Sequence, residues 1–172
     1  LDRYGRVLYA GTFSKVLYPG LRLAYLVVPE DCVPPFEATV SLLRMDSPAL
    51  QQATVADFME QGHFSRHLKK MRAPYGERRG YLVAALEQAF GDALQIPDRA
   101  GGLHVLGYWR GEQRDSAVAQ AANAHGLAIH ALSTWKMKGK ADQGLLLGFA
   151  NLGSAYAARD AVRHLLRAMA PI

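Results

Sequence analysis

Two apolar segments near the start of the chain have the composition of buried strands. Residues 6–13 (RVLYAGTF) and 21–28 (LRLAYLVV) are rich in β-branched and aromatic residues, and Pro19-Gly20 between them is a strong turn signal. The second segment is almost wholly apolar after Arg22, a pattern typical of strands that are covered on both faces in α/β sheets. Two strands cannot provide that cover alone, so the sequence predicts that they belong to a larger sheet.

Helical periodicity dominates the middle of the chain. One helix is expected to begin at Ser47-Pro48, with serine as the N-cap and proline in the first turn, and to end at Gly62. Pro74 is expected to kink the next, longer helix, and Gly91 to end it. The apolar stripe of this long helix has mostly three- and four-residue steps and consists of Phe64, Leu68, Met71, Tyr75, Leu82, Leu86 and Phe90.

A mixed pattern follows Gly91. Strands are expected over residues 103–109, 127–132 and 144–150, with helices over residues 115–125 and from about residue 154 onward. This β-α-β-β-α order predicts a small α+β layer in which helices cover one sheet. The apolar residues expected to point inward from the two helices are Val118, Ala121, Ala122, Val162, Leu165, Leu166 and Met169.

Composition narrows the class of protein without indicating a function. Half of the 172 residues are hydrophobic and a fifth are charged, as in soluble globular proteins. No apolar run approaches the roughly 18–20 residues that span a bilayer, so no membrane role is expected. The single cysteine, Cys32, excludes an internal disulfide, indicates a cytoplasmic setting, and has no nearby base in sequence to activate it. The start at Leu1 rather than at methionine suggests a piece of a longer protein.

The net charge of +5 could indicate contact with nucleic acid. Neither interleaved aromatic residues nor zinc-ligand spacing accompanies the basic residues, so solvated surface is the simpler interpretation. The same interpretation applies to Lys136, Lys138 and Lys140, which crowd one predicted loop. The basic residues of the long helix are Arg66, Lys69, Lys70, Arg72, Arg78 and Arg79.

Three histidines are weaker candidates for a site. His63 and His67 lie four residues apart, as two metal ligands of a helix do, but the residues between them lack the glutamate of a metalloprotease motif. A structural role is therefore the better hypothesis for both. His104 follows two glycines at the start of a predicted strand, where it either faces a site or occupies an ordinary strand position.

The segment with the most specific chemistry connects the first two strands. Lys15 follows the first strand, and Arg22 comes seven residues later at the start of the second. A lysine amine whose neutral form is favoured by its surroundings is a nucleophile that can form a Schiff base with an aldehyde. The guanidinium of Arg22 suits a phosphate, and Thr12 and Ser14 add hydroxyl donors. The residues suit a ligand that carries both an aldehyde and a phosphate. A surface loop with an ordinary lysine fits the spacing as well.

The sequence GTFSK followed by PGLRLAYLVVP resembles the cofactor-lysine region of fold-type I enzymes that use pyridoxal phosphate (PLP), the aspartate aminotransferase group. It is more similar still to the aminotransferase-like domain of the MocR group of GntR-type bacterial transcription regulators. Residues 47–79, AGGLHV at 100–105 and LLLGFANL at 145–152 resemble the same group, so the resemblance covers nearly the whole chain.

This resemblance implies roles for four residues and a set of partners. Lys15 matches the lysine that holds PLP as a Schiff base, Arg22 the phosphate-binding arginine, and Thr12 the phosphate-binding hydroxyl residue, with Ser14 as a further candidate. A homodimer and a small amino compound as ligand or substrate are expected. DNA would be bound only through an upstream domain that these residues do not contain.

Two departures from the family pattern bear on activity. Members that process amino acids often carry an arginine just before the last apolar strand motif, whereas this chain has Leu145, Leu146 and Leu147. The earlier half of the family domain, which holds the partners of the pyridine ring, is not among these residues. The isolated chain is therefore expected to bind PLP weakly and to be inactive as an enzyme.

The sequence thus predicts an α/β protein of the PLP-dependent transferase-like fold type I, represented in part. Residues 1–61 are expected to be a remnant of the large PLP-binding domain with two of its strands. Residues 62–172 are expected to form a bridging helix and a small C-terminal α+β domain. The expected function is the effector or sensor domain of a MocR/GntR-type regulator, and the alternative is a PLP-dependent aminotransferase acting on an amino acid.

Overall fold

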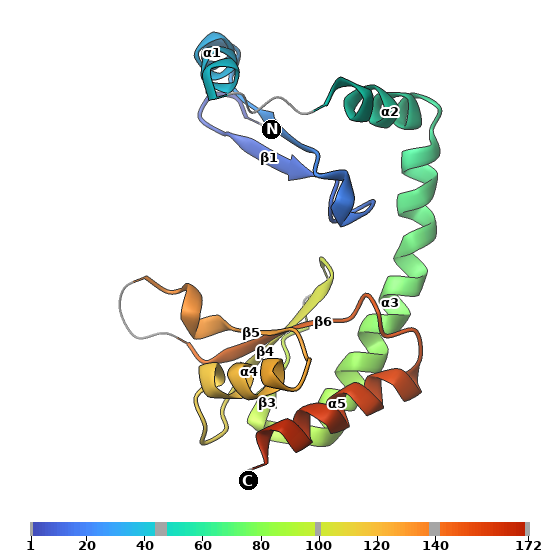
Figure 1. The fold of residues 1–172 in the computed structure, drawn as a ribbon, viewed down its shortest axis with the longest axis vertical. Helices are drawn as coiled ribbons and strands as arrows, with labels where there is room; N and C mark the ends of the chain where they lie inside the picture. The colour runs from blue at the N-terminus through green and yellow to red at the C-terminus, as the bar shows by residue number, and fades with distance from the viewer. Residues whose placement is uncertain (1, 44–47, 99–100, 138–141, 171–172) are drawn as a thin grey trace. The chain divides into compact units, whose positions relative to one another are not determined.

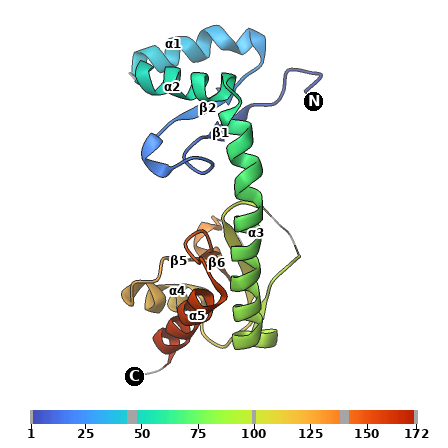
Figure 2. The same ribbon diagram turned by 90° about the vertical axis from the view of Figure 1, so that its right-hand side faces the viewer.

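The computed structural model describes residues 2–43, 48–98, 101–137 and 142–170. The chain forms two compact units, one up to Lys70 and the other from Met71 onward, and Figure 1 follows it from the N-terminus to the C-terminus by colour. Helix α3 (His63–Phe90) is 28 residues long and contributes residues to both units. Pro74 lies inside this helix, which Figure 2 shows as one continuous ribbon.

The first unit contains an antiparallel strand pair and two helices ahead of α3. Thr12 lies opposite Ala24 in the strand pair, and Tyr9 lies opposite Val27. The elements are β1 (Tyr9–Thr12), a 3-10 turn (Pro19–Leu21), β2 (Ala24–Val27), a second 3-10 turn (Glu30–Cys32), α1 (Val33–Leu43) and α2 (Ala49–Glu60). Both expected strands are confirmed, although each is shorter than its apolar segment.

The boundaries of α2 differ slightly from the expected ones. Pro48 occupies the N-cap position and not the first helical turn, while Ser47 lies outside the described residues. The helix ends at Glu60, and Gly62 has a φ of 72°, a backbone conformation that glycine adopts without steric cost. The expected stop at Gly62 is therefore confirmed.

The first unit buries little of its apolar surface. Its described core consists of Leu21, Leu23 and Val55, with Phe13 and Leu17 packed against them. All four residues of β2 are exposed. The sequence pattern of β2 is that of a covered strand, so its exposure means that the cover does not come from the described residues.

The second unit is an α+β layer built on a four-stranded antiparallel sheet in the order β3-β4-β6-β5. Its elements after α3 are a 3-10 turn (Gly91–Ala93), β3 (Leu94–Gln95), β4 (His104–Trp109), α4 (Asp115–Ala124), β5 (Ile129–Ala131), another 3-10 turn (Leu132–Trp135), β6 (Gly144–Gly148) and α5 (Ala155–Met169). The expected β-α-β-β-α order is confirmed. The short strand β3 precedes it and was not predicted, because two residues carry no periodic signal.

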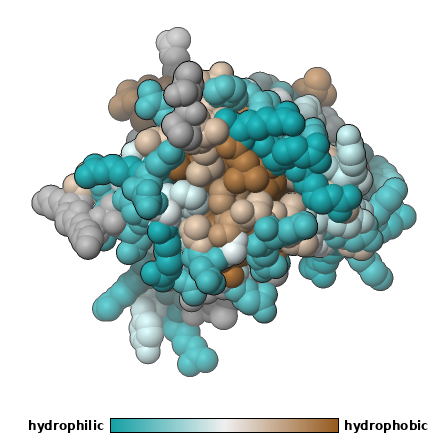
Figure 3. Space-filling model, turned by 90° about the horizontal axis from the view of Figure 1, so that it is seen from below, coloured by the Kyte–Doolittle hydropathy of each residue, from teal (hydrophilic) through white to brown (hydrophobic). Residues whose placement is uncertain are grey.

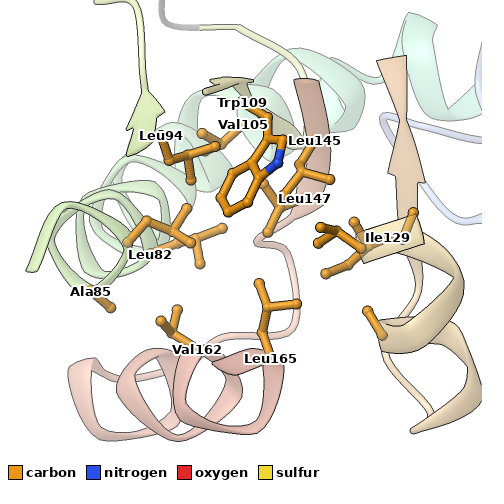
Figure 4. Packing of buried hydrophobic residues seen from close by; sticks show 14 of the residues in the cluster. Leu82, Ala85, Leu94, Val105, Trp109, Ile129, Leu145, Leu147, Val162 and Leu165 are labelled. Carbon is orange, nitrogen blue, oxygen red and sulfur yellow. The ribbon is translucent and has the colours of Figure 1, made fainter. Parts of the chain in front are cut away.

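One face of the sheet supplies the core, together with α3, α4 and α5. Alternate residues of β4 and β6 point inward, so that Val105, Trp109, Leu145 and Leu147 are buried. Figure 4 shows these side chains converging with Leu82 of α3 and with Val162 and Leu165 of α5. Packing of α3, α4 and α5 on this one sheet face matches the layer that the sequence predicts.

Burial of the last two helices agrees with most of the expected inward residues. Val118, Ala122, Val162 and Leu165 are buried. Ala121 and Met169 are half-buried, whereas Leu166 is 40% exposed, so its predicted inward position is wrong. Ala168 is buried in its place, because the inward stripe of α5 advances by three residues from Leu165.

A buried carboxylate joins three parts of the second unit. Asp115, the first residue of α4, is fully buried and accepts hydrogen bonds from the Ser133 amide (2.9 Å), the Ser133 hydroxyl (2.6 Å) and the Gly144 amide (3.0 Å). Burial raises the pKa of this carboxyl, but these hydrogen bonds and one from the Ser116 amide outweigh the effect and hold the pKa below its ordinary value of 3.8. The group therefore stays charged and fastens α4 to the sheet.

The surface is mixed in character. Figure 3 shows hydrophilic side chains surrounding an apolar area on the face seen from below in Figure 1. Large apolar side chains are also exposed elsewhere, among them Val27 (56%) and Leu43 (59%) of the first unit. Within the described ranges, no helix combines the length and the hydropathy that crossing a membrane requires.

Candidate functional site

Lys15 lies in the loop between β1 and β2, at the centre of a single tight turn. The Leu17 amide donates to the Phe13 carbonyl (2.8 Å) and the Val16 amide donates to the same oxygen (3.2 Å). The Phe13 amide in turn donates to the Leu23 carbonyl (3.0 Å), which ties the turn to the start of β2. The Lys15 side chain is exposed, and its amine makes no hydrogen bond or ion pair with any described residue.

Thr12 and Ser14 are linked on the β1 side of this loop. The Thr12 hydroxyl donates to the Leu23 carbonyl (3.3 Å) and accepts a hydrogen bond from the Ser14 amide (3.2 Å). The Ser14 side chain is half-buried. A phosphate would require Thr12 to turn its proton away from Leu23, which an exposed hydroxyl can do by rotation.

Arg22 lies on the β2 side of the loop with an unusual backbone. Its φ of 49° and ψ of 30° place it in the left-handed region, and its amide donates to the Pro19 carbonyl (3.4 Å). A residue other than glycine adopts this conformation at a cost of about 1–2 kcal/mol. The side chain is exposed, whereas its neighbours Leu21 and Leu23 are buried and anchor the backbone.

The four residues expected from the sequence thus lie at one end of the strand pair. Leu23, which follows Arg22, accepts the bond from Thr12, and Thr12 accepts the bond from the residue before Lys15. An amine, two hydroxyls and a guanidinium match an aldehyde and a phosphate on one ligand. The residues present therefore fit pyridoxal phosphate in the chemistry of their donors.

Two residues of α3 also contact the loop, and the sequence did not single them out for this role. The Phe64 ring lies edge-on to the Phe13 ring, with 5.9 Å between centroids. The His67 imidazole lies 3.0 Å from the Val16 carbonyl through Nε2. No short-range pattern could have indicated these contacts, because 51 residues separate His67 from Val16.

Both ring nitrogens of His63 have partners within the protein. His63 Nδ1 lies 3.0 Å from the Arg66 guanidinium and Nε2 lies 3.1 Å from Gln61 Oε1, so both ring nitrogens have partners. Among the residues that the structure describes, no group of three potential metal ligands occurs. The structural interpretation of His63 and His67 is the better supported one.

The basic residues of α3 are not uniformly solvated. The Arg66 guanidinium donates to the Gly62 carbonyl (3.3 Å), and Arg78 donates to the Ala150 carbonyl and lies over the Tyr75 ring. Lys69, Lys70 and Arg72 are exposed. The interpretation as a solvated face therefore holds for part of the set only. In the other basic group, Lys136 is exposed, whereas Lys138 and Lys140 lie outside the described residues.

The thiol of Cys32 is half-buried beside Asp31. Burial raises the pKa of this thiol, and the negative charge and hydrogen bond of the neighbouring Asp31 raise it further. A thiol with a raised pKa is protonated at neutral pH and is a poor nucleophile, in agreement with the sequence interpretation.

The three leucines of β6 do not share one environment. Leu145 and Leu147 are buried in the core, so Leu146 alone points to the opposite face of the sheet. There it lines a groove of about 310 Å³, whose other lining residues are Arg79, Ile96, Pro97, Gly101, His104, Val105, Leu106 and Tyr108. His104 therefore faces a groove, and position 146 presents an alkyl group to it.

A comparison with protein families matches residues 1–141 to the aminotransferase class I and II family. An uncharacterized HTH-type transcriptional regulator of Bacillus subtilis, YhdI, is 32% identical over 172 residues, covering 100% of this chain and 36% of that protein. The probable rhizopine catabolism regulatory protein MocR of Rhizobium meliloti is 34% identical over 152 residues, covering 88% of this chain and 31% of that protein.

A solved structure has the same fold over nearly the whole chain. LysN, an α-aminoadipate aminotransferase from Thermus thermophilus complexed with N-(5'-phosphopyridoxyl)-L-leucine, superposes with a TM-score of 0.83 at 26% identity. The match covers 96% of this chain and 42% of LysN. The chain thus spans about a third of the length of these curated relatives and less than half of that enzyme.

Proposed function

Because the chain belongs to the aminotransferase class I and II family, with the α/β fold of fold-type I enzymes, we propose that it is the C-terminal part of a PLP-binding sensor domain. The parent would be a MocR/GntR-type transcription regulator. The observation that carries the proposal is the loop that gathers Lys15, Thr12, Ser14 and Arg22 at one end of the strand pair. The relatives named as regulators support this role for the parent.

Pyridoxal phosphate is the cofactor that the family indicates. When bound, it supplies an aldehyde and an electron-withdrawing ring. The exposed Lys15 amine would attach to the aldehyde, and the fixed turn of residues 13–17 would limit the directions in which that amine can reach. The Arg22 guanidinium and the Thr12 and Ser14 hydroxyls would hold the phosphate by charge-assisted hydrogen bonds.

Position 146 favours a sensor over an amino-acid transaminase. A transaminase must hold the carboxylate of its substrate, and a guanidinium is the side chain best suited to do so. Leu146 is the residue of β6 that faces the groove, and it presents an alkyl group there; the guanidinium that lines the groove belongs to Arg79 of α3. An aminotransferase remains the second candidate, because the fold is that of aminotransferases.

The remaining parts of the proposal concern domains and partners. We place the boundary of the large-domain remnant at residue 61, just before α3 begins. The exposed strands of the first unit support a homodimer, in which apolar surface is covered by association. A small amino compound would be the effector, DNA would be contacted through an upstream domain, and the location would be the cytoplasm.

Replacing Arg22 with glycine separates phosphate binding from folding. The change should weaken PLP binding by about tenfold or more, because one charge-assisted partner of the phosphate is lost. Relief of the left-handed strain at φ 49° should offset the extra chain entropy of glycine, so the first unit should remain folded. Titration of the variant with PLP measures the affinity, and its circular dichroism spectrum measures whether the first unit remains folded.

The matched control is Arg3→Gly, which removes the same charge from an exposed position ahead of β1. Its affinity for PLP should equal that of the wild-type chain. Equal weakening in both variants would mean that net charge alone attracts the phosphate, and the role of Arg22 would be refuted.

The regulatory role is tested on the full-length protein with DNA from upstream of its own gene. Addition of PLP should change the affinity in a mobility-shift titration, and Lys15→Ala should remove that change while leaving the cofactor-free affinity intact. A protein that binds no DNA and converts amino acids to oxo acids would be the aminotransferase of the second candidate.

A further inference from the structure

The Lys15 loop is held from two sides. On one side, Phe13 and Leu17 pack against the small core of Leu21, Leu23 and Val55. On the other side, Phe64 and His67 of the first turns of α3 contact the loop through the Phe13 ring and the Val16 carbonyl. The two contacts lie on either side of Lys15 in sequence, so α3 holds the loop both before and after the lysine.

The bond from His67 has a defined direction. A carbonyl oxygen only accepts hydrogen bonds, so Nε2 of His67 carries the proton and donates it to Val16 at 3.0 Å. The Val16 carbonyl belongs to the residue next to Lys15. The peptide between Val16 and Leu17 is held at its other end by the Leu17 amide, which donates to the Phe13 carbonyl (2.8 Å). Loss of the His67 donor would remove one of these two bonds and loosen the turn that carries Lys15.

We propose that His67 is a positioning residue for Lys15: it fixes the loop carbonyl next to the lysine and thereby sets where the amine points. This inference rests on the proposed cofactor role of Lys15. His67 itself does not contact the cofactor. The imidazole acts through the backbone of Val16, and Phe64 holds the preceding residues through its ring contact.

Three variants of the 172-residue chain separate this role from simple packing. His67→Leu removes the donor and puts an apolar side chain of similar size in its place. His67→Gln keeps an amide donor at a similar reach. His63→Leu is the control, because His63 bonds to Gln61 and Arg66 and not to the loop.

The first readout needs no cofactor. The Leu17 amide, which donates to Phe13 inside the turn, should exchange its hydrogen about threefold to tenfold faster in His67→Leu, the effect of losing one hydrogen bond. Its exchange should stay at the wild-type rate in His67→Gln and His63→Leu. Unchanged exchange in His67→Leu, or no rescue by glutamine, would overturn the proposal.

The second readout measures how well the loop positions the Lys15 amine for reaction with PLP. Full-length protein with the same variants is incubated with PLP, reduced with borohydride and digested, and the pyridoxyl label at Lys15 is compared with that at the exposed Lys69. His67→Leu should lower the label at Lys15 about threefold to tenfold, in line with the first readout, and leave Lys69 unchanged. Equal labelling of Lys15 in wild type and His67→Leu would refute the positioning role. If wild-type Lys15 is not labelled above Lys69, the proposed cofactor role fails, while the exchange rates still show whether His67 holds the loop.

Discussion

Asp115→Ala is expected to lower the free energy of unfolding of the second unit by about 3 kcal/mol. The variant leaves the Ser133 amide, the Ser133 hydroxyl and the Gly144 amide without their acceptor in a buried place. Chemical denaturation followed by tryptophan fluorescence measures the change, because both tryptophans of the chain, Trp109 and Trp135, lie in the second unit.

Two further variants test whether the loss comes from these hydrogen bonds. Asp115→Asn keeps one acceptor oxygen for the two amides, and the Ser133 hydroxyl can turn to accept from the new amide group. Asp115→Asn should therefore lower the free energy of unfolding by clearly less than Asp115→Ala. Asp160→Ala removes an exposed carboxylate 3.6 Å from Arg163 and should have little effect. A similar loss for all three variants would contradict the account.

The stabilisation by Asp115 should also depend on pH with a definite sign. The pKa of the folded state lies below the ordinary value of 3.8, so the carboxylate stabilises the second unit above that value. This contribution is lost as the pH falls through the lowered pKa. The difference in unfolding free energy between wild type and Asp115→Ala should therefore be constant near neutrality and shrink in acid.

Lys15→Ala is expected to abolish the visible absorption band that PLP develops with the full-length protein. The Lys15 amine is exposed and lies in the loop with three residues suited to phosphate. The control Lys69→Ala removes an exposed amine from α3 and should retain the band. Loss of the band in both variants would mean that the change in net charge matters, whereas its survival in Lys15→Ala would exclude this lysine.

Local sequence signals were enough for most of the second unit. The short apolar segments that contain β4 and β6 were expected as strands at nearly their observed places. The last helix likewise begins where it was expected, after Ser154, whose hydroxyl accepts from the Ala157 amide (3.1 Å). The buried role of Asp115 could not be predicted. Its partners lie 18 and 29 residues away, and a charged residue at a helix start usually remains in solvent.

The candidate site also combines features that the sequence predicts with features that only the structure shows. The proximity of Lys15, Thr12, Ser14 and Arg22 follows from a strand, a turn and a strand, which the sequence predicts directly. The left-handed backbone of Arg22 could not be foreseen, because a Pro-Gly turn signal points to glycine for such a conformation. The contact of His67 with Val16 depends on how α3 packs on the loop, and only tertiary structure shows it.

The central claim is that Lys15 is the residue that binds the cofactor, and peptide mapping tests it most directly. The full-length protein is incubated with PLP and reduced with borohydride, and the modified lysine is identified by mass spectrometry. A pyridoxyl group is expected on the peptide that contains Lys15. A saturated adduct on another lysine, with Lys15 unmodified, would contradict it.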